Sequence, residues 1–124
     1  MKYSGECKTY HKNNQVKELF NLDKGVITGT FKSFYESGKP KEVIQYLNGE
    51  QTGEREEYFE NGNKKYTVTK LTDKRQFEHY WYHENGNPKK LEHKLIDKDE
   101  RIGTYKEWYE NGQLAETGTY ISNY

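Results

Sequence analysis

The stretch Tyr58-Phe59-Glu60-Asn61-Gly62 decides the fold of this chain, because close variants of it recur along the sequence. The other copies are Phe34-Tyr35-Glu36-Ser37-Gly38, Tyr82-His83-Glu84-Asn85-Gly86 and Trp108-Tyr109-Glu110-Asn111-Gly112. The four glycines are spaced 24, 24 and 26 residues apart. A fixed period of this length predicts a repeat architecture in which each copy is one supersecondary unit.

A more divergent copy precedes these four. Asn14, in the segment Tyr10-His11-Lys12-Asn13-Asn14, stands 24 residues before Gly38. Asparagine is the residue other than glycine that best tolerates a left-handed backbone. Nine residues before the five turn positions the sequence has Gly5, Gly29, Gly53, Phe77 and Gly103. We therefore expect one domain, residues 1–124, with copies at about 5–28, 29–52, 53–76, 77–102 and 103–124.

Each copy is expected to form one β-hairpin. Asn-Gly between two short runs of aromatic and β-branched residues indicates a type I′ turn, whose two central residues both need positive φ. The aromatic pair belongs to the first strand, and runs such as Val43-Ile44-Gln45-Tyr46-Leu47 form the second. Further turns lead from copy to copy; these are Asp23-Lys24-Gly25, Asn48-Gly49, Thr72-Asp73-Lys74 and the longer Asp97-Lys98-Asp99-Glu100.

The predicted fold class is all-β: a single-layer antiparallel β-meander of about five stacked hairpin repeats, elongated and twisted. Successive side chains of a strand point to opposite faces, so adjacent rings such as Tyr58 and Phe59 are expected on different faces of the sheet. Neither face is then purely polar, and neither is a continuous apolar core. This distribution favours one layer over a sandwich.

Composition narrows the class of partner. Hydrophobic residues make up only 31% of the chain while aromatic residues make up 15%, so rings must supply most of the apolar contacts. Twenty Lys and Arg balance twenty Asp and Glu. The chain as a whole therefore lacks the positive field that drives binding to nucleic acid, and we expect no nucleic-acid partner. Cys7 is the only cysteine, which excludes an intramolecular disulfide and a cysteine-rich metal site.

The N-terminal residues, Met1-Lys2-Tyr3-Ser4-Gly5-Glu6, lack the apolar stretch of a signal peptide. No segment of the chain has the run of apolar residues that a transmembrane helix needs. We therefore expect a soluble, cytoplasmic protein.

The five copies resemble the MORN repeat, in the variant written around Tyr-Tyr-Glu-Asn-Gly that occurs in bacterial YwqK-type antitoxin proteins. The resemblance is carried by the Glu-Asn-Gly turns and the aromatic pairs before them, and it covers nearly the whole chain. It implies an elongated, curved scaffold without enzymatic activity. The sequence departs from the pattern at Asn14, Ser37, Phe77 and the two-residue insertion near Asp97, which affects copies one and four most.

The sequence offers few candidates for catalysis or metal binding. His79 and His83 are four residues apart, which on a strand separates them by about 13 Å, too far for one metal ion. No nucleophile elbow, phosphate loop or distinct pair of catalytic carboxylates can be identified in the sequence. We therefore expect no enzyme, no cofactor and no metal site.

Recurring charges accompany every turn. Glu36, Glu60, Glu84 and Glu110 are expected to serve as turn or cross-strand partners, for instance of Lys41, Lys65 and Lys89. These lysines and Lys17 form a row that faces aromatic residues and could suit an anionic lipid. Because glutamates interleave the row and the net charge is zero, we prefer a solvated face whose lysine stems cover the rings.

Copy four carries more rings than its neighbours and supplies the predicted partner site. It reads Phe77-Glu78-His79-Tyr80-Trp81-Tyr82-His83, with Tyr80 and Trp81 where other copies have Lys32 and Ser33 or Glu56 and Glu57. We expect Trp81 to anchor an interface. The residues expected beside it are His79 and His83 on its own side, with Tyr35 and Tyr105 in the flanking copies. The alternative is that the extra rings fill a gap left where Phe77 replaces glycine.

The sequence thus predicts a non-catalytic repeat module that binds a protein partner. The resemblance implies an antitoxin or immunity role in which the sheet sequesters a cognate toxin. The alternative, which the resemblance also allows, is a scaffold or membrane-associating MORN module that binds anionic lipid.

Overall fold

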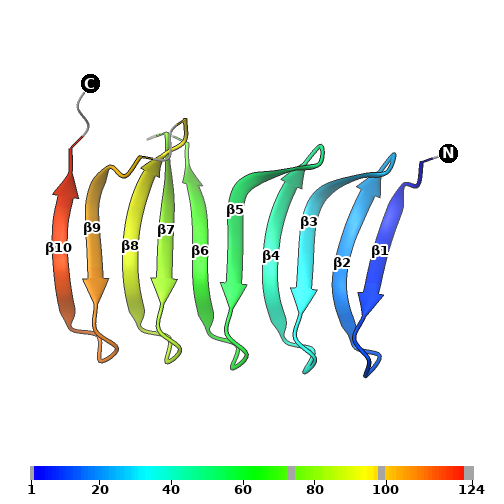
Figure 1. Ribbon diagram of the computed structural model, residues 1–124, viewed down its shortest axis with the longest axis horizontal. Helices are drawn as coiled ribbons and strands as arrows, with labels where there is room; N and C mark the ends of the chain where they lie inside the picture. The colour runs from blue at the N-terminus through cyan, green and yellow to red at the C-terminus, as the bar shows by residue number, and fades with distance from the viewer. Residues whose placement is uncertain (1, 73–74, 98–99, 122–124) are drawn as a thin grey trace.

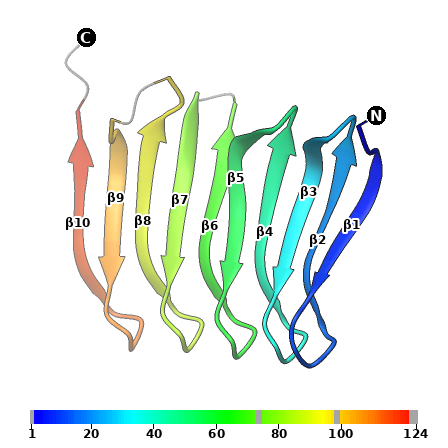
Figure 2. The ribbon, with the colours of Figure 1, turned by 45° about the vertical axis from the view of Figure 1, so that its right-hand side comes forward.

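In the computed structural model, which describes residues 2–72, 75–97 and 100–121, ten strands form one antiparallel sheet in sequence order (Figure 1). The strands are β1 (Gly5–Tyr10), β2 (Val16–Asp23), β3 (Val26–Phe34), β4 (Pro40–Leu47), β5 (Glu50–Tyr58), β6 (Lys64–Leu71), β7 (Gln76–Tyr82), β8 (Pro88–Leu95), β9 (Gly103–Trp108) and β10 (Leu114–Tyr120). Figure 2 shows the same single layer from a second direction, with β1 and β10 at opposite ends. The predicted all-β meander of hairpins is confirmed.

The Glu-Asn-Gly turns differ from the predicted type I′ geometry. In copy three the carbonyl of Phe59 accepts a hydrogen bond from the Gly62 amide at 2.9 Å, and the Phe59 amide donates to Asn63 at 2.8 Å. Gly62 has a φ of 94°, whereas Asn61 is not among the residues with positive φ. The loop is therefore a type I turn followed by a left-handed residue, the three-residue hairpin connection. The prediction of a type I′ turn here was wrong.

The side chain of Asn61 explains this choice, because its Oδ1 accepts a hydrogen bond from the Asn63 amide at 2.8 Å and so favours the tight turn. Asn14 takes the left-handed position in copy one with a φ of 72°, as the sequence predicts.

Type I′ geometry occurs instead between copies. Asn48 and Gly49 have φ values of 50° and 87° and join Leu47 to its directly paired residue Glu50. Lys24 and Gly25 do the same between β2 and β3, with φ values of 51° and 81°. Two of the predicted connections include Asp73, Lys74, Lys98 and Asp99, which lie outside the described residues.

The second glycine of copy three marks a bulge, and copy four shows what happens without it. Gly53 has a φ of 99°, and the β4–β5 register shifts opposite it, between Ile44 and Tyr46. Phe77 replaces this glycine in β7, and the β6–β7 pairing runs without a shift. A Cβ added at Gly53 would lie 2.7 Å from Cζ of Phe77, so the Phe77 ring occupies the space above the glycine of the preceding copy.

Hydrogen bonds between turns tie each copy to the next. Nδ2 of Asn61 donates to the Glu84 carbonyl at 2.8 Å, and Nδ2 of Asn85 donates to the Glu110 carbonyl at 2.9 Å. In the described part of the chain no ion pair joins the turn glutamates to Lys41, Lys65 or Lys89. Glu84 and Glu110 therefore take part through their backbone carbonyls, not through the carboxylates that the sequence suggested.

Register assigns the strand residues to two faces. The face named here the Trp81 face carries two rows, Phe31, Ile44, Arg55, Val68, His79 and Glu92, and Ser33, Glu42, Glu57, Tyr66, Trp81 and Lys90. The opposite Tyr80 face carries the row Lys32, Val43, Glu56, Thr67, Tyr80 and Leu91.

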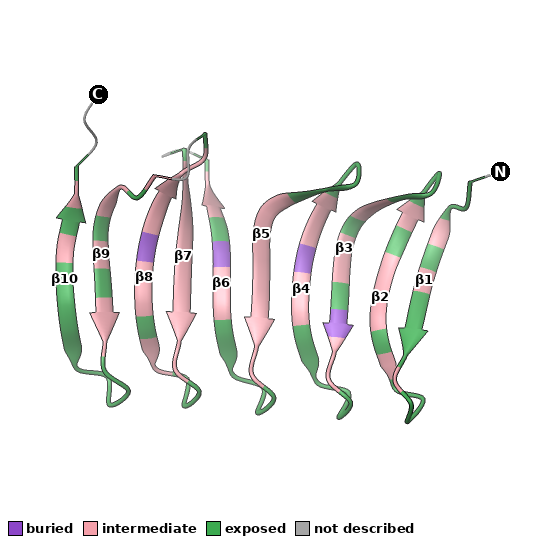
Figure 3. Cartoon of the chain, viewed as in Figure 1, coloured by how far each residue is buried: buried purple, intermediate pink, exposed green. Residues whose placement is uncertain are grey.

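The most buried residues all lie on the Trp81 face. Among the described residues these are Ser33, Ile44, Val68 and Glu92, which are 4 to 7% exposed (Figure 3). At these four positions the neighbouring side chains therefore exclude water, although no second layer covers the face.

Candidate binding surface

Three rings form a cluster on the Trp81 face, across β6 and β7. The Trp81 ring stacks on Tyr66, its direct cross-strand partner, with 5.0 Å between centroids. His79 stacks on Trp81 at 5.8 Å and on Tyr66 at 6.0 Å. All three side chains are half-buried, so part of each ring surface remains accessible.

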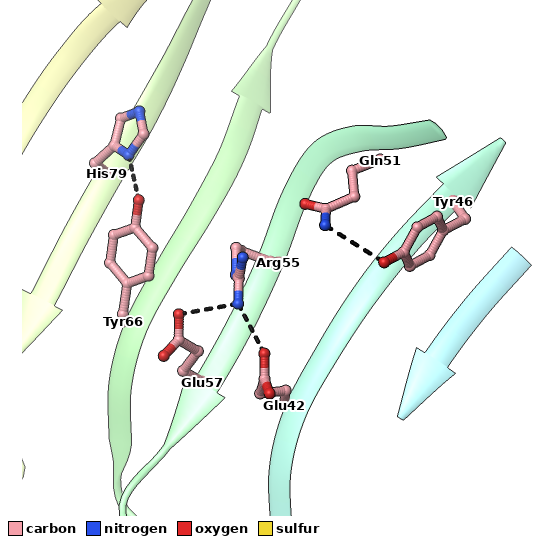
Figure 4. A network of polar contacts seen from close by, with 7 residues as sticks. All are labelled: Glu42, Tyr46, Gln51, Arg55, Glu57, Tyr66 and His79. Carbon is pink, nitrogen blue, oxygen red and sulfur yellow. Dashed lines mark hydrogen bonds and ion pairs between the residues drawn. The ribbon is translucent and has the colours of Figure 1, made fainter. Parts of the chain in front are cut away.

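Polar contacts fix the orientation of this cluster. The Tyr66 hydroxyl lies 2.6 Å from Nδ1 of His79 (Figure 4), and burial raises the pKa of the Tyr66 phenol. The Lys90 ammonium lies 5.4 Å from the centre of the Trp81 ring, within the range of a cation–π contact.

An ion-pair network continues the Trp81 face toward β4. The Arg55 guanidinium contacts Glu42 at 2.8 Å and Glu57 at 3.2 Å, as Figure 4 shows. The three side chains are about equally shielded from solvent, with 27 to 28% of each exposed. This network holds the guanidinium against the sheet and leaves neither of the two carboxylates without a cation.

The structure brings together some of the predicted site residues and separates others. His79 contacts Trp81, as expected. His83 and Tyr35 lie beyond the strand ends, as the first residues of their turns. Nε2 of His83 lies 3.0 Å from the Trp108 carbonyl, and the Tyr35 hydroxyl donates to the Tyr58 carbonyl at 2.6 Å. Both side chains therefore link their own copy to the next and do not join the cluster around Trp81.

Tyr105 lies on the Trp81 face but apart from Trp81. It is in β9, and β8 separates it from β7. Its ring packs on Tyr120 with 4.9 Å between centroids, and a Cβ added at Gly118 would lie 2.6 Å from its Cζ. Tyr105 thus covers a glycine of copy five in the way that Phe77 covers Gly53.

The predicted role of the turn lysines is confirmed at two positions. The ammonium of Lys41 lies 5.8 Å from the centre of the Tyr35 ring, and that of Lys65 lies 5.8 Å from the centre of the Phe59 ring. These lysines cover rings at the turn end of the sheet.

Sequence reasoning missed two groups of residues. It did not name Tyr66, because the partner of Trp81 across β6 depends on the register. It also set aside the stack on the other face, where the Tyr80 ring lies parallel to Tyr82 at 4.9 Å and to Trp108 at 6.0 Å. The alternation of Tyr80 and Tyr82 along one strand is the signal that could have indicated this stack.

The described residues show neither a cluster of metal ligands nor a membrane-spanning helix. No group of three or more His, Cys, Asp or Glu side chains in residues 2–72, 75–97 and 100–121 could hold a metal ion. No helix in these ranges is both long and apolar enough to cross a membrane.

The open sheet, the repeated hairpins and the ring ladders define a repeat protein built from β-hairpins. The profile of the MORN repeat variant matches residues 3–23, 27–48, 51–69, 78–93 and 101–122, and the chain belongs to this family. Repeats of this family generally form modules that bind proteins or membranes and are generally non-catalytic. No curated protein shows a significant match to the chain.

Proposed function

We propose that this chain is a non-catalytic module that binds a protein partner. The observation that carries the proposal is the cluster of Tyr66, His79 and Trp81, three rings in contact and none of them buried, on a sheet that no second layer covers. Partly exposed Trp and Tyr side chains with a fixed orientation are the residues that most often dominate protein interfaces. Trp81 is the proposed anchor, since it contacts both other rings.

The specific version of this proposal is an antitoxin or immunity role in the cytoplasm. The sheet would sequester a toxic protein by covering part of its surface. The resemblance of the Tyr-Tyr-Glu-Asn-Gly pattern to YwqK-type antitoxins supports this version. A cytoplasmic setting also suits the single free thiol of Cys7.

Co-expression tests the specific version. The product of the gene next to that of this chain is produced in a bacterial host alone, with this chain, and with the Trp81→Ala variant. We expect the neighbouring product to stop growth alone and the intact chain to restore growth and to co-purify with it. Lack of any toxicity, or toxicity that the chain does not relieve, would contradict the antitoxin role.

Liposome flotation separates protein binding from the membrane alternative. Vesicles of neutral lipid and vesicles containing an anionic phospholipid are compared at physiological salt. We expect the chain to remain in the bottom fraction with both, because Lys41 and Lys65 already lie over rings and the net charge is zero. Flotation only with anionic vesicles would favour the membrane module.

A further inference from the structure

A trough of about 370 Å³ follows β6 on the Tyr80 face. Its lining includes Glu54, Glu56, Thr67, Thr69, Tyr80 and Tyr82. The residues of β5, β6 and β7 that line it are paired directly, with Glu56 opposite Thr67 and Thr67 opposite Tyr80. The trough therefore lies on the face opposite the Trp81 cluster and shares none of the rings of that cluster.

Short side chains on β6 create the trough. Thr67 occupies the repeat position held by Leu19, Val43 and Leu91 in β2, β4 and β8, and Thr69 occupies that of Asn21, Gln45 and His93. Only β10, at the edge of the sheet, repeats the two threonines, as Thr117 and Thr119. Copy three is thus the one interior copy whose second strand has short side chains at both of these positions. The strands on either side of it, β5 and β7, carry longer side chains on this face.

One wall of the trough is aromatic. Tyr80 stacks on Tyr82 with an angle of 14° between the ring planes, and on Trp108 with an angle of 6°. Burial raises the pKa of the Tyr80 phenol. The stack holds the Tyr80 ring beside the trough, and the half-buried ring leaves part of its surface accessible to a planar or cationic group.

The other wall is acidic. Glu54 and Glu56 stand where β3 has Thr30 and Lys32 and where β9 has Thr104 and Lys106. Glu56 accepts a hydrogen bond from the Tyr58 hydroxyl. Within the described residues no cation pairs with Glu54 or Glu56.

Two further charged residues adjoin the trough. Glu78 adds a carboxylate on the β7 side, 3.2 Å from Nε2 of His93, and Lys64 lies at the turn end. The guanidinium of Arg55 is held by Glu42 and Glu57. Carboxylates therefore outnumber free cations along the trough, although the chain as a whole is neutral.

The shape of the trough favours an extended segment as the bound group. From Lys64 to Thr69 the trough extends about 17 Å along β6, and its lining reaches from Val43 and Gln45 on β4 to Tyr80 on β7. An extended segment fits, with alternate side chains directed into the trough.

We propose that the trough binds an extended, arginine-rich segment of a protein partner. The inference rests on the proposed function as a protein-binding module and names the chemistry of one contact. A guanidinium can stack on the Tyr80 ring and at the same time donate two hydrogen bonds to the carboxylate of Glu54 or Glu56, which an ammonium cannot do. The trough supplies both partners on its two sides, with Thr67 between Glu56 and Tyr80.

The test uses fluorescence anisotropy with a labelled peptide of about eight residues that alternates Arg and Ser. The comparison peptides alternate Lys and Ser, or Glu and Ser. We expect saturable binding of the arginine peptide, weaker binding of the lysine peptide and none of the acidic peptide. The double variant Glu54→Gln/Glu56→Gln should weaken binding by about tenfold or more, since each lost charge contact has a cost of this order.

A matched pair of variants separates the trough from general surface charge. Thr67→Leu fills the trough with the residue that β2 and β8 carry, whereas Thr117→Leu makes the same change on β10. We expect Thr67→Leu to weaken binding at least about fivefold and Thr117→Leu to change it less than about twofold. Circular dichroism confirms that both variants are folded. Equal binding by the two variants, or no saturable binding of the arginine peptide, would overturn the inference.

The same variants distinguish this inference from the proposed function. A co-purified partner that binds as tightly to the Glu54→Gln/Glu56→Gln and Thr67→Leu variants as to the unaltered chain would overturn the inference and leave the proposed function standing. Specific peptide binding by a chain that relieves no toxicity would support the trough and contradict the antitoxin role.

Discussion

The two faces of this single-layer sheet differ in how far their side chains are packed. On the Trp81 face the described residues include four that are 4 to 7% exposed, and the rings of Phe77 and Tyr105 lie over Gly53 and Gly118. On the Tyr80 face no described residue is as buried. The threonines of the interior strand β6 are shorter there than the acidic side chains of β5 and the aromatic side chains of β7. A sheet without a second layer can thus have one face that stabilises it and another that stays open.

The largest expected effect comes from the glycine beneath Phe77. Gly53→Val should destabilise the chain by about 3 kcal/mol, because the backbone is left-handed there and a new Cβ would meet the Phe77 ring at 2.7 Å. Gly62→Val is the control, with a φ of 94° and nothing within 4 Å of an added Cβ. It should cost more than about 1 kcal/mol but less than Gly53→Val. Urea denaturation measures both, and equal costs would show that Phe77 does not pack on Gly53.

A pair of valines compares the two faces directly. Val68 is 6% exposed on the Trp81 face, and Val43 is half-buried on the Tyr80 face. Val68→Ala should cost about 2 kcal/mol, from the lost transfer free energy and the cavity that remains. Val43→Ala should cost less than about 1 kcal/mol, because water already reaches its side chain. A larger loss at Val43 would reverse the assignment of the packed face.

A smaller effect is expected from Tyr58, whose hydrogen bond to Glu56 and burial raise its pKa from 10.0 to about 12. The folded state holds this proton more tightly than the unfolded state, so the associated stability is complete below pH 10 and is lost as the pH rises toward about 12. Ultraviolet titration of tyrosinate should show a late-ionising phenol that Glu56→Gln shifts to lower pH. Glu54→Gln is the control and should leave it in place.

The sequence was sufficient for the strands and their order, because the period and the turn glycines repeat at every copy. It was insufficient for the turn type, since Asn61 favours a type I turn through a side-chain hydrogen bond that Asn-Gly statistics do not specify. His83 and Tyr35 were expected beside Trp81 because strict alternation was extended past the strand ends. The trough depends on which short and long side chains face each other across three strands, and that follows only from the register.

Substitution of Trp81 separates binding from packing, because this residue belongs to the packed face and is also the proposed anchor for the partner. Phe31 provides the matched control, since its ring packs on Phe20 at 5.7 Å and on Tyr46 at 6.2 Å on the same face, two copies away from Trp81. Each ring should contribute to stability about as much as one or two cross-strand pairs, about 1 kcal/mol.

The decisive measurement is a calorimetric titration of the co-purified partner into Trp81→Ala and Phe31→Ala, with the melting temperature of each variant recorded. We expect similar, modest losses of stability in both variants, and a loss of binding free energy of about 2 kcal/mol or more in Trp81→Ala alone. Unchanged affinity in Trp81→Ala, together with a loss of stability well beyond that of Phe31→Ala, would show that Trp81 serves the packing of the sheet and would contradict its role as the anchor.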